Sequence, residues 1–140
     1  MTLLDTIYTL KNIALKQPNI RTAVEGNIYE LMNSNPSLEY GVFVITQEAH
    51  TSDEGFNNFT FNLFYVDRLV NNLEDNRLQI QSIGIEVLNN IISTFCNVTG
   101  CDSTYPTFNV FTQKFKDECS GVYCRITFDV EKEIYCAEEY

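Results

Sequence analysis

Residue types on which catalysis often depends are scarce in this chain. Its 140 residues include one histidine, His50, and no tryptophan. No Ser-His-Asp set can be built without His50, and no glycine-rich phosphate-binding loop is present. No apolar run approaches the length of a membrane span, and the N-terminus lacks a signal-peptide pattern. We therefore expect no enzyme, no cofactor site and no membrane contact.

Positive charge is scarce as well. The sequence has nine Lys and Arg residues and nineteen Asp and Glu residues, which gives a net charge of −10. An acidic surface repels phosphates, so we expect no tightly bound nucleic acid. The same repulsion permits DNA that slides past without sticking. Hydrophobic residues make up 44% of the sequence, and the length suits a single domain over residues 1–140 with a core of its own.

The five cysteines are an odd number, which is typical of reduced thiols in a cytosol. Cys96 and Cys101 are separated by four residues, and so are Cys119 and Cys124. Four thiolates can hold zinc, but this spacing departs from the usual C-x₂-C knuckle, and Cys124 falls on the apolar side of a predicted strand. We expect free thiols and no metal site.

The chain is organised around residues 58–96, which predict a long strand, a polar turn and a long helix. Aromatic and aliphatic residues at every second position from Phe59 to Tyr65 indicate the strand. Asn71 and Asn72 begin the polar turn. Asn76 is a plausible N-cap, with Gln79 three residues later as in a capping box. The apolar face of the helix would then comprise Ile80, Ile83, Gly84, Val87, Leu88, Ile91 and Phe95.

The remaining periodicities predict one more helix and three more strands. Residues 2–16 form an amphipathic pattern in which Thr2 and Asp5 make a capping box, and Pro18 ends the helix. Residues 27–31 are expected to be a short extended segment. Strands are expected at residues 40–47, 107–115 and 122–132. The order predicts an α+β fold, an antiparallel sheet of about four strands with two helices packed on one face.

The same periodicities predict which side chains meet in the core. The apolar face of the long helix should pack on apolar residues of three strands. The expected core comprises Ile80, Val87, Ile91 and Phe95 of the helix, and Val42, Val44, Phe61, Leu63, Ile126 and Phe128 of the sheet.

The opposite face of the long helix is polar but carries almost no charge. Only Glu86 is charged among its residues, which are Gln79, Ser82, Glu86, Asn89, Asn90 and Ser93. A neutral polar face costs less to desolvate than a charged one, so it suits a subunit contact. It is equally consistent with an ordinary solvated face in an asparagine-rich protein.

Residues 49–58 form the second candidate contact. This polar ten-residue stretch contains Asp53, Glu54 and Phe56 and is too long for a tight hairpin loop. We expect it to project as an arm or flap that reaches a neighbouring subunit.

Five segments together resemble a known group of proteins: NIYEL at 27–31, YGVFVIT at 40–46, FNLFYVDRL at 61–69, IQSIGI at 80–85 and FKDECSGVY at 115–123. They are similar to a family of small structural proteins from tailed phages and prophages of gut Bacteroidota, including crAss-like phages. The order of elements also resembles that of tail-terminator and tail-completion proteins.

The resemblance implies a ring at the head–tail junction or in the tail. Such proteins assemble as cyclic oligomers, of six or twelve copies, against other neck and tail proteins, and DNA passes through the lumen. The location implied is the virion, after assembly in the host cytoplasm, and no catalytic residue carries over. The residues themselves leave two other interpretations open. One is a small cytosolic adaptor or regulatory binding domain, and the other is a thiol- or zinc-dependent enzyme.

Overall fold

The computed structural model describes residues 1–34, 38–70 and 74–132, and within these ranges the fold is α+β. The polar turn predicted at Asn71 and Asn72 lies outside the described residues. The helices are α1 (Leu3–Leu15), α2 (Ile28–Ser34) and α3 (Glu74–Thr99). The strands are β1 (Thr22–Glu25), β2 (Val42–Ser52), β3 (Phe56–Arg68), β4 (Asp102–Ser103), β5 (Phe108–Lys114) and β6 (Glu118–Glu131).

All six described strands belong to one mixed sheet. Its order is β1-β2-β3-β6-β4, and β5 also pairs with β6. β1 runs parallel to β2, whereas the other pairs are antiparallel. The α+β class is therefore confirmed, but the prediction of about four antiparallel strands and two helices was too simple. The sequence pattern missed β1 and β4 because they are only four and two residues long.

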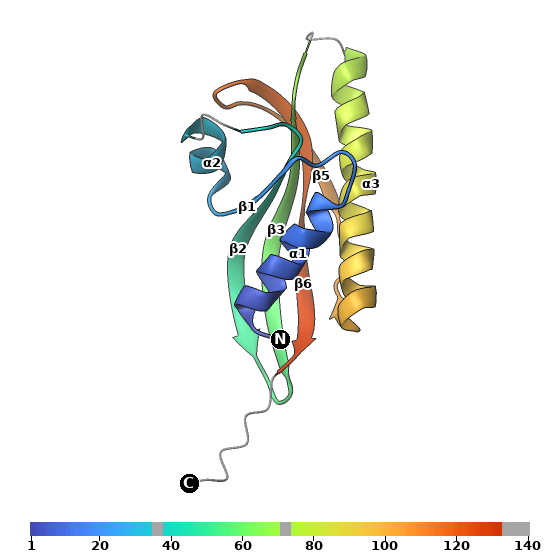
Figure 1. Cartoon of the computed structure of the whole chain (residues 1–140). Helices are drawn as coiled ribbons and strands as arrows, with labels where there is room; N and C mark the ends of the chain where they lie inside the picture. The colour runs from blue at the N-terminus through green and yellow to red at the C-terminus, as the bar shows by residue number, and fades with distance from the viewer. Residues whose placement is uncertain (35–37, 71–73, 133–140) are drawn as a thin grey trace.

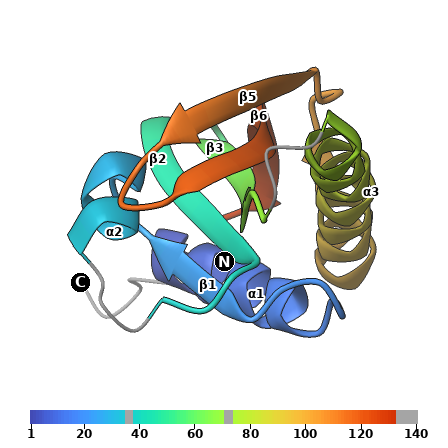
Figure 2. The ribbon, with the colours of Figure 1, turned by 90° about the horizontal axis from the view of Figure 1, so that it is seen from above.

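The helices lie on both faces of the sheet, and not on one as predicted. α1 and α3 cover one face, and the short α2 packs near one end of the other face (Figures 1 and 2). The segment predicted to be extended at residues 27–31 is the beginning of α2. Asn27 caps this helix, since its Oδ1 accepts hydrogen bonds from the backbone N–H of Tyr29 at 2.9 Å and of Glu30 at 3.2 Å.

The core beneath α3 contains most of the side chains predicted for it. Ile80, Val87, Ile91 and Phe95 are buried against Phe61, Leu63, Ile126 and Phe128. Val42 and Val44 were assigned to the wrong face. They pack with Met32 of α2, while Phe43 and Ile45 point toward α1 and α3. The error is one of phase, because successive side chains of a strand alternate between its two faces.

The ends of the helices also test the capping predictions. The box at α1 is confirmed, with Thr2 Oγ1 accepting from the Asp5 N–H at 3.1 Å and Asp5 Oδ2 accepting from the Thr2 N–H at 3.2 Å. Hydrogen bonding from the Thr2 backbone and side chain lowers the pKa of Asp5. Asn76 is not an N-cap, because α3 already begins at Glu74. Asn76 Oδ1 instead accepts from the backbone N–H of Val70 at 3.0 Å.

Candidate functional site

The first candidate surface is the outer face of α3, where the sequence predicted a subunit contact. All six predicted residues are exposed: Gln79, Ser82, Glu86, Asn89, Asn90 and Ser93. Glu86 is the only charged residue between Leu78 and Thr99. Leu78 and Val98, near the two ends of the helix, are 49% and 69% exposed. A partner that covers this face would therefore desolvate a single ionised group, which keeps the cost of burial low.

The second predicted surface has a different structure from the one expected. Residues 49–58 are not a long loop, because β2 continues to Ser52, β3 begins at Phe56, and the two strands form a hairpin. The ladder pairs Ala49 with Thr60 and Ser52 with Asn57, after a bulge between Gln47 and Ala49. From Thr51 to Asn58 its side chains other than Phe56 are polar or glycine, so the alternation that reveals a strand in sequence is absent there.

The turn of this hairpin is held by its own residues. The Asp53 N–H donates to the Phe56 carbonyl at 3.0 Å, and Asp53 Oδ1 accepts from the Phe56 N–H at 3.2 Å. Gly55 has a φ of 101°, a value that L side chains rarely adopt. Asp53, Glu54 and Phe56 are all exposed, and the tip extends past the ends of α1 and α3 in Figure 1. The tip and the outer face of α3 therefore do not form one site.

A third surface, which the sequence did not reveal, lies on the sheet face opposite α3. Leu63 and Tyr65 point toward α3, so Phe64 between them faces the other way. Its ring is 5.4 Å from that of Tyr123 and 6.2 Å from that of Phe111. A cavity of about 290 Å³ opens beside these rings. We call it the aromatic pocket, and its lining is Tyr29, Phe64, Phe111, Phe115 and Tyr123, with Ile28, Asn62 and Gln113.

Among the described residues that line the aromatic pocket, none is ionised. Its two amide side chains, Asn62 and Gln113, stand beside five aromatic rings. The Asn62 amide already has a hydrogen-bond partner, because its Nδ2 donates to Glu48 Oε2 at 3.2 Å. The Gln113 amide has no hydrogen-bond partner among the described residues and is exposed. A neutral ligand or side chain with an aromatic body and one polar end matches this chemistry.

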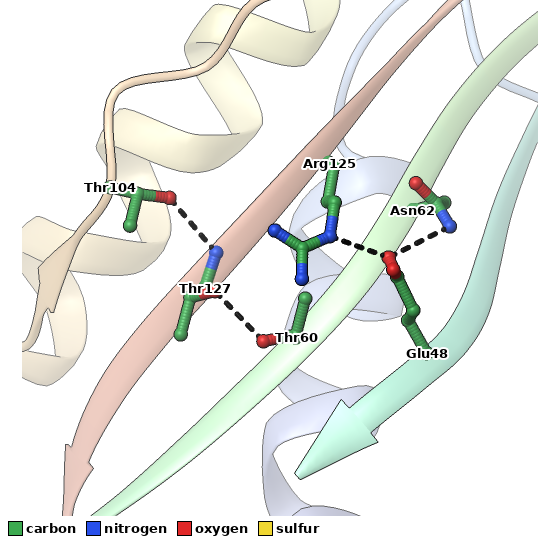
Figure 3. Close-up of polar contacts among 6 residues, drawn as sticks. All are labelled: Glu48, Thr60, Asn62, Thr104, Arg125 and Thr127. Carbon is green, nitrogen blue, oxygen red and sulfur yellow. Dashed lines mark hydrogen bonds and ion pairs between the residues drawn. The ribbon is translucent and has the colours of Figure 1, made fainter.

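On the same face of the sheet, between the aromatic pocket and the hairpin tip, polar contacts connect β2, β3 and β6 (Figure 3). Arg125 Nε lies 2.9 Å from Glu48 Oε2, so β6 and β2 are joined across β3 by an exposed ion pair. Thr60 Oγ1 and Thr127 Oγ1 are 2.8 Å apart. Thr104 Oγ1 accepts from the Thr127 N–H at 3.0 Å, and the Thr104 N–H donates to the Thr127 carbonyl at 3.0 Å. These two bonds fix the connection between β4 and β5 to the edge of β6.

Of the four cysteines that the structure describes, Cys96 and Cys101 form a close pair. Cys101 Sγ donates to Cys96 Sγ at 3.7 Å, and burial raises the pKa of Cys101 to about 11. Cys119 and Cys124 are both buried but point to opposite faces of β6. A thiol with a raised pKa is protonated at neutral pH and is a weak nucleophile. Among the described residues, no three His, Cys, Asp or Glu side chains are placed to bind one metal ion.

His50, the single imidazole, sits in the hairpin and not in a catalytic set. Its Nε2 is 3.0 Å from Gln47 Oε1, and its ring packs at 5.2 Å from Phe59. Within the described ranges, no helix is long and apolar enough to span a membrane. No protein family matches the chain, and no curated protein matches it either.

Proposed function

We propose that the chain is the subunit of a structural ring in the neck or tail of a tailed phage. Six or twelve copies would stand side by side in the virion, after assembly in the host cytoplasm. The segment resemblance supports this proposal, but one observation carries it. Two surfaces with little charge, the outer face of α3 with Glu86 as its one ionised side chain and the aromatic pocket, lie on opposite sides of one sheet.

The opposite placement matters because of symmetry. A ring is built from heterologous contacts, in which one patch of a subunit meets a different patch of the next. A two-fold dimer instead uses one patch that meets its own copy. Two distinct patches of low charge, one on each side of the sheet, provide what the ring requires.

The charge of the chain suits a DNA conduit. With a net charge of −10, a ring of these subunits gives the phosphates of a passing genome little to bind. The hairpin tip, with Asp53 and Glu54, would reach an adjoining ring of the neck or tail, because it extends past the helices. The proposal gives the chain no catalytic role and no cofactor.

Isosteric charge variants of α3 test the ring. Asn89→Asp together with Asn90→Asp adds two negative charges to the outer face without changing its shape. We expect the ring to need at least tenfold more protein to assemble, as measured by mass photometry over a concentration series. Asn12→Asp, at an exposed asparagine of α1, is the control that adds a negative charge away from this face, and it should assemble like the unmodified chain.

The adaptor interpretation makes a different prediction from the same structure. The aromatic pocket would then bind a partner protein, and the chain itself would stay monomeric. Assembly that is unchanged by the two α3 charges would remove this helix from the contact. A chain that is monomeric at every concentration would favour the adaptor over the ring.

A further inference from the structure

Tyr105 is the most exposed aromatic side chain among the described residues, at 98%. It lies in the connection between β4 and β5, followed by Pro106, and no residue from Ser103 to Gln113 is charged. A tyrosine buries a large apolar area when it is covered, so an interface that covers the exposed Tyr105 side chain would gain a favourable binding free energy from it. Tyr105 is therefore the side chain that gains most from a partner.

The backbone beside Tyr105 is held in place. The neighbouring Thr104 makes two hydrogen bonds of 3.0 Å with the backbone of Thr127 on β6, of which Figure 3 shows the one from the Thr127 N–H to Thr104 Oγ1. The ring of Pro106 fixes its own φ. A side chain on an ordered backbone loses less entropy when it binds than one on a flexible loop. Tyr105 thus resembles a preorganised anchor of an interface.

The aromatic pocket has the chemistry that a tyrosine requires. Phe64, Phe111 and Tyr123 offer ring faces and edges, and the unpartnered Gln113 amide can pair with a phenol hydroxyl. Copies with a net charge of −10 repel one another, so they meet most easily where neither surface is charged. Residues 103–107 and the pocket lining are two such surfaces.

We infer that Tyr105 of one copy inserts into the aromatic pocket of the next copy. This inference rests on the proposed ring and names one of its contacts. The pocket lies on the sheet face opposite α3, whereas Tyr105 lies near the β6 edge, beside a hollow that Asn89 and Ser93 of α3 also line. The contact is therefore heterologous, and each bound copy leaves a free Tyr105 and a free pocket for the next.

Variants of each half test the contact. Tyr105→Ala should raise the protein concentration needed for assembly at least tenfold, and Tyr105→Phe, which keeps the ring, should raise it less. Gln113→Arg, at an exposed site, should block the pocket and weaken assembly similarly. Tyr8→Ala, at an exposed tyrosine of α1, is the control and should assemble normally. Circular dichroism checks that each variant is folded.

A mixing experiment tests the direction of the contact. The Tyr105→Ala chain retains its pocket, and the Gln113→Arg chain retains its tyrosine. Their mixture should give one-to-one dimers in native mass spectrometry that neither variant gives alone, and these dimers should not grow into rings at the same concentration. A mixture that contains only monomers would overturn the inference.

The ring and the tyrosine contact fail in distinguishable ways. If Tyr105→Ala forms rings at the same concentration as the unmodified chain, the contact is wrong and the ring stands. If the unmodified chain stops at a dimer that Tyr105→Ala abolishes, the contact stands and the ring fails. An unmodified chain that never associates overturns both.

Discussion

The ring of Phe95 on α3 lies 4.6 Å from the ring of Phe128 on β6, and both side chains are fully buried. Phe128 also lies 6.3 Å from Phe61 on β3. One aromatic side chain thus contacts the helix and the neighbouring strand at once. This contact helps to fix the position of α3 on the sheet, together with the other buried residues of the helix.

Phe128→Ala should destabilise the fold strongly. Removing a buried phenylalanine leaves a cavity and costs about 3–5 kcal/mol in the free energy of unfolding. Urea denaturation of the monomer measures this change in the free energy of unfolding. Val110→Ala, at a side chain that is 54% exposed, should change the free energy by less than about 0.5 kcal/mol. A shift of a few tenths for Phe128→Ala would show that the core is not packed as described.

Gly84 allows α3 to approach the sheet closely. A Cβ at this position would lie 2.9 Å from Val122 Cγ2 and 3.0 Å from Tyr65 Cδ2. Gly84→Leu should therefore displace the helix and cost about 1–3 kcal/mol through overpacking. Thr94→Leu, at an exposed position of the same helix, should cost far less. Equal stabilities of these two variants would contradict the close approach.

The hairpin tip can be shortened without disturbing the sheet. Deleting Thr51, Ser52, Asn57 and Asn58 removes two pairs of the β2–β3 ladder and two pairs of the β3–β6 ladder, keeps the turn, and leaves the other side chains on their original faces. The domain should stay folded, because exposed hairpin ends tolerate deletion. Contact with an adjoining ring should weaken, which co-sedimentation with neck or tail proteins measures. Loss of the circular dichroism signal would instead show that the tip supports the fold.

Alkaline pH should destabilise the fold through its buried thiols. Burial raises the pKa of Cys124 to about 12, from an ordinary value of 9.0. The folded state favours the protonated thiol, so its contribution is complete below pH 9 and is lost as pH rises from about 9 to 12. The free energy of unfolding should fall over that window, and Cys124→Ala should fall less steeply. If the free energy of unfolding falls equally steeply with pH in both chains, ionisation of the Cys124 thiol does not destabilise the fold.

Some elements were predictable because each leaves a local signal. β6 alternates apolar and polar residues from Val122 to Val130, and α1 has its capping box in Thr2 and Asp5. The phase of β2 was not predictable. Val42, Phe43, Val44 and Ile45 are apolar on both sides, so alternation cannot tell which residues face α3.

Other features depend on contacts that the sequence does not encode locally. The end of the β2–β3 hairpin, residues 51–58, is mostly polar, and it is a strand pair only because each strand supplies the hydrogen bonds of the other. α2 was missed for a different, local reason: its cap Asn27 stands beside Gly26, and this pair of residues is also the signal of a turn. The aromatic pocket joins Phe64 of β3, Phe111 of β5 and Tyr123 of β6. Which rings meet follows from the strand order, and this is why the pocket was missed.

The most direct test of the proposed ring is a negative-stain image of the purified, unmodified chain, supported by its native mass. The proposal predicts closed rings with a central opening and a mass of six or twelve copies of the 16.1 kDa chain. Particles with the mass of a single chain, at concentrations well above those of the variant experiments, would contradict it.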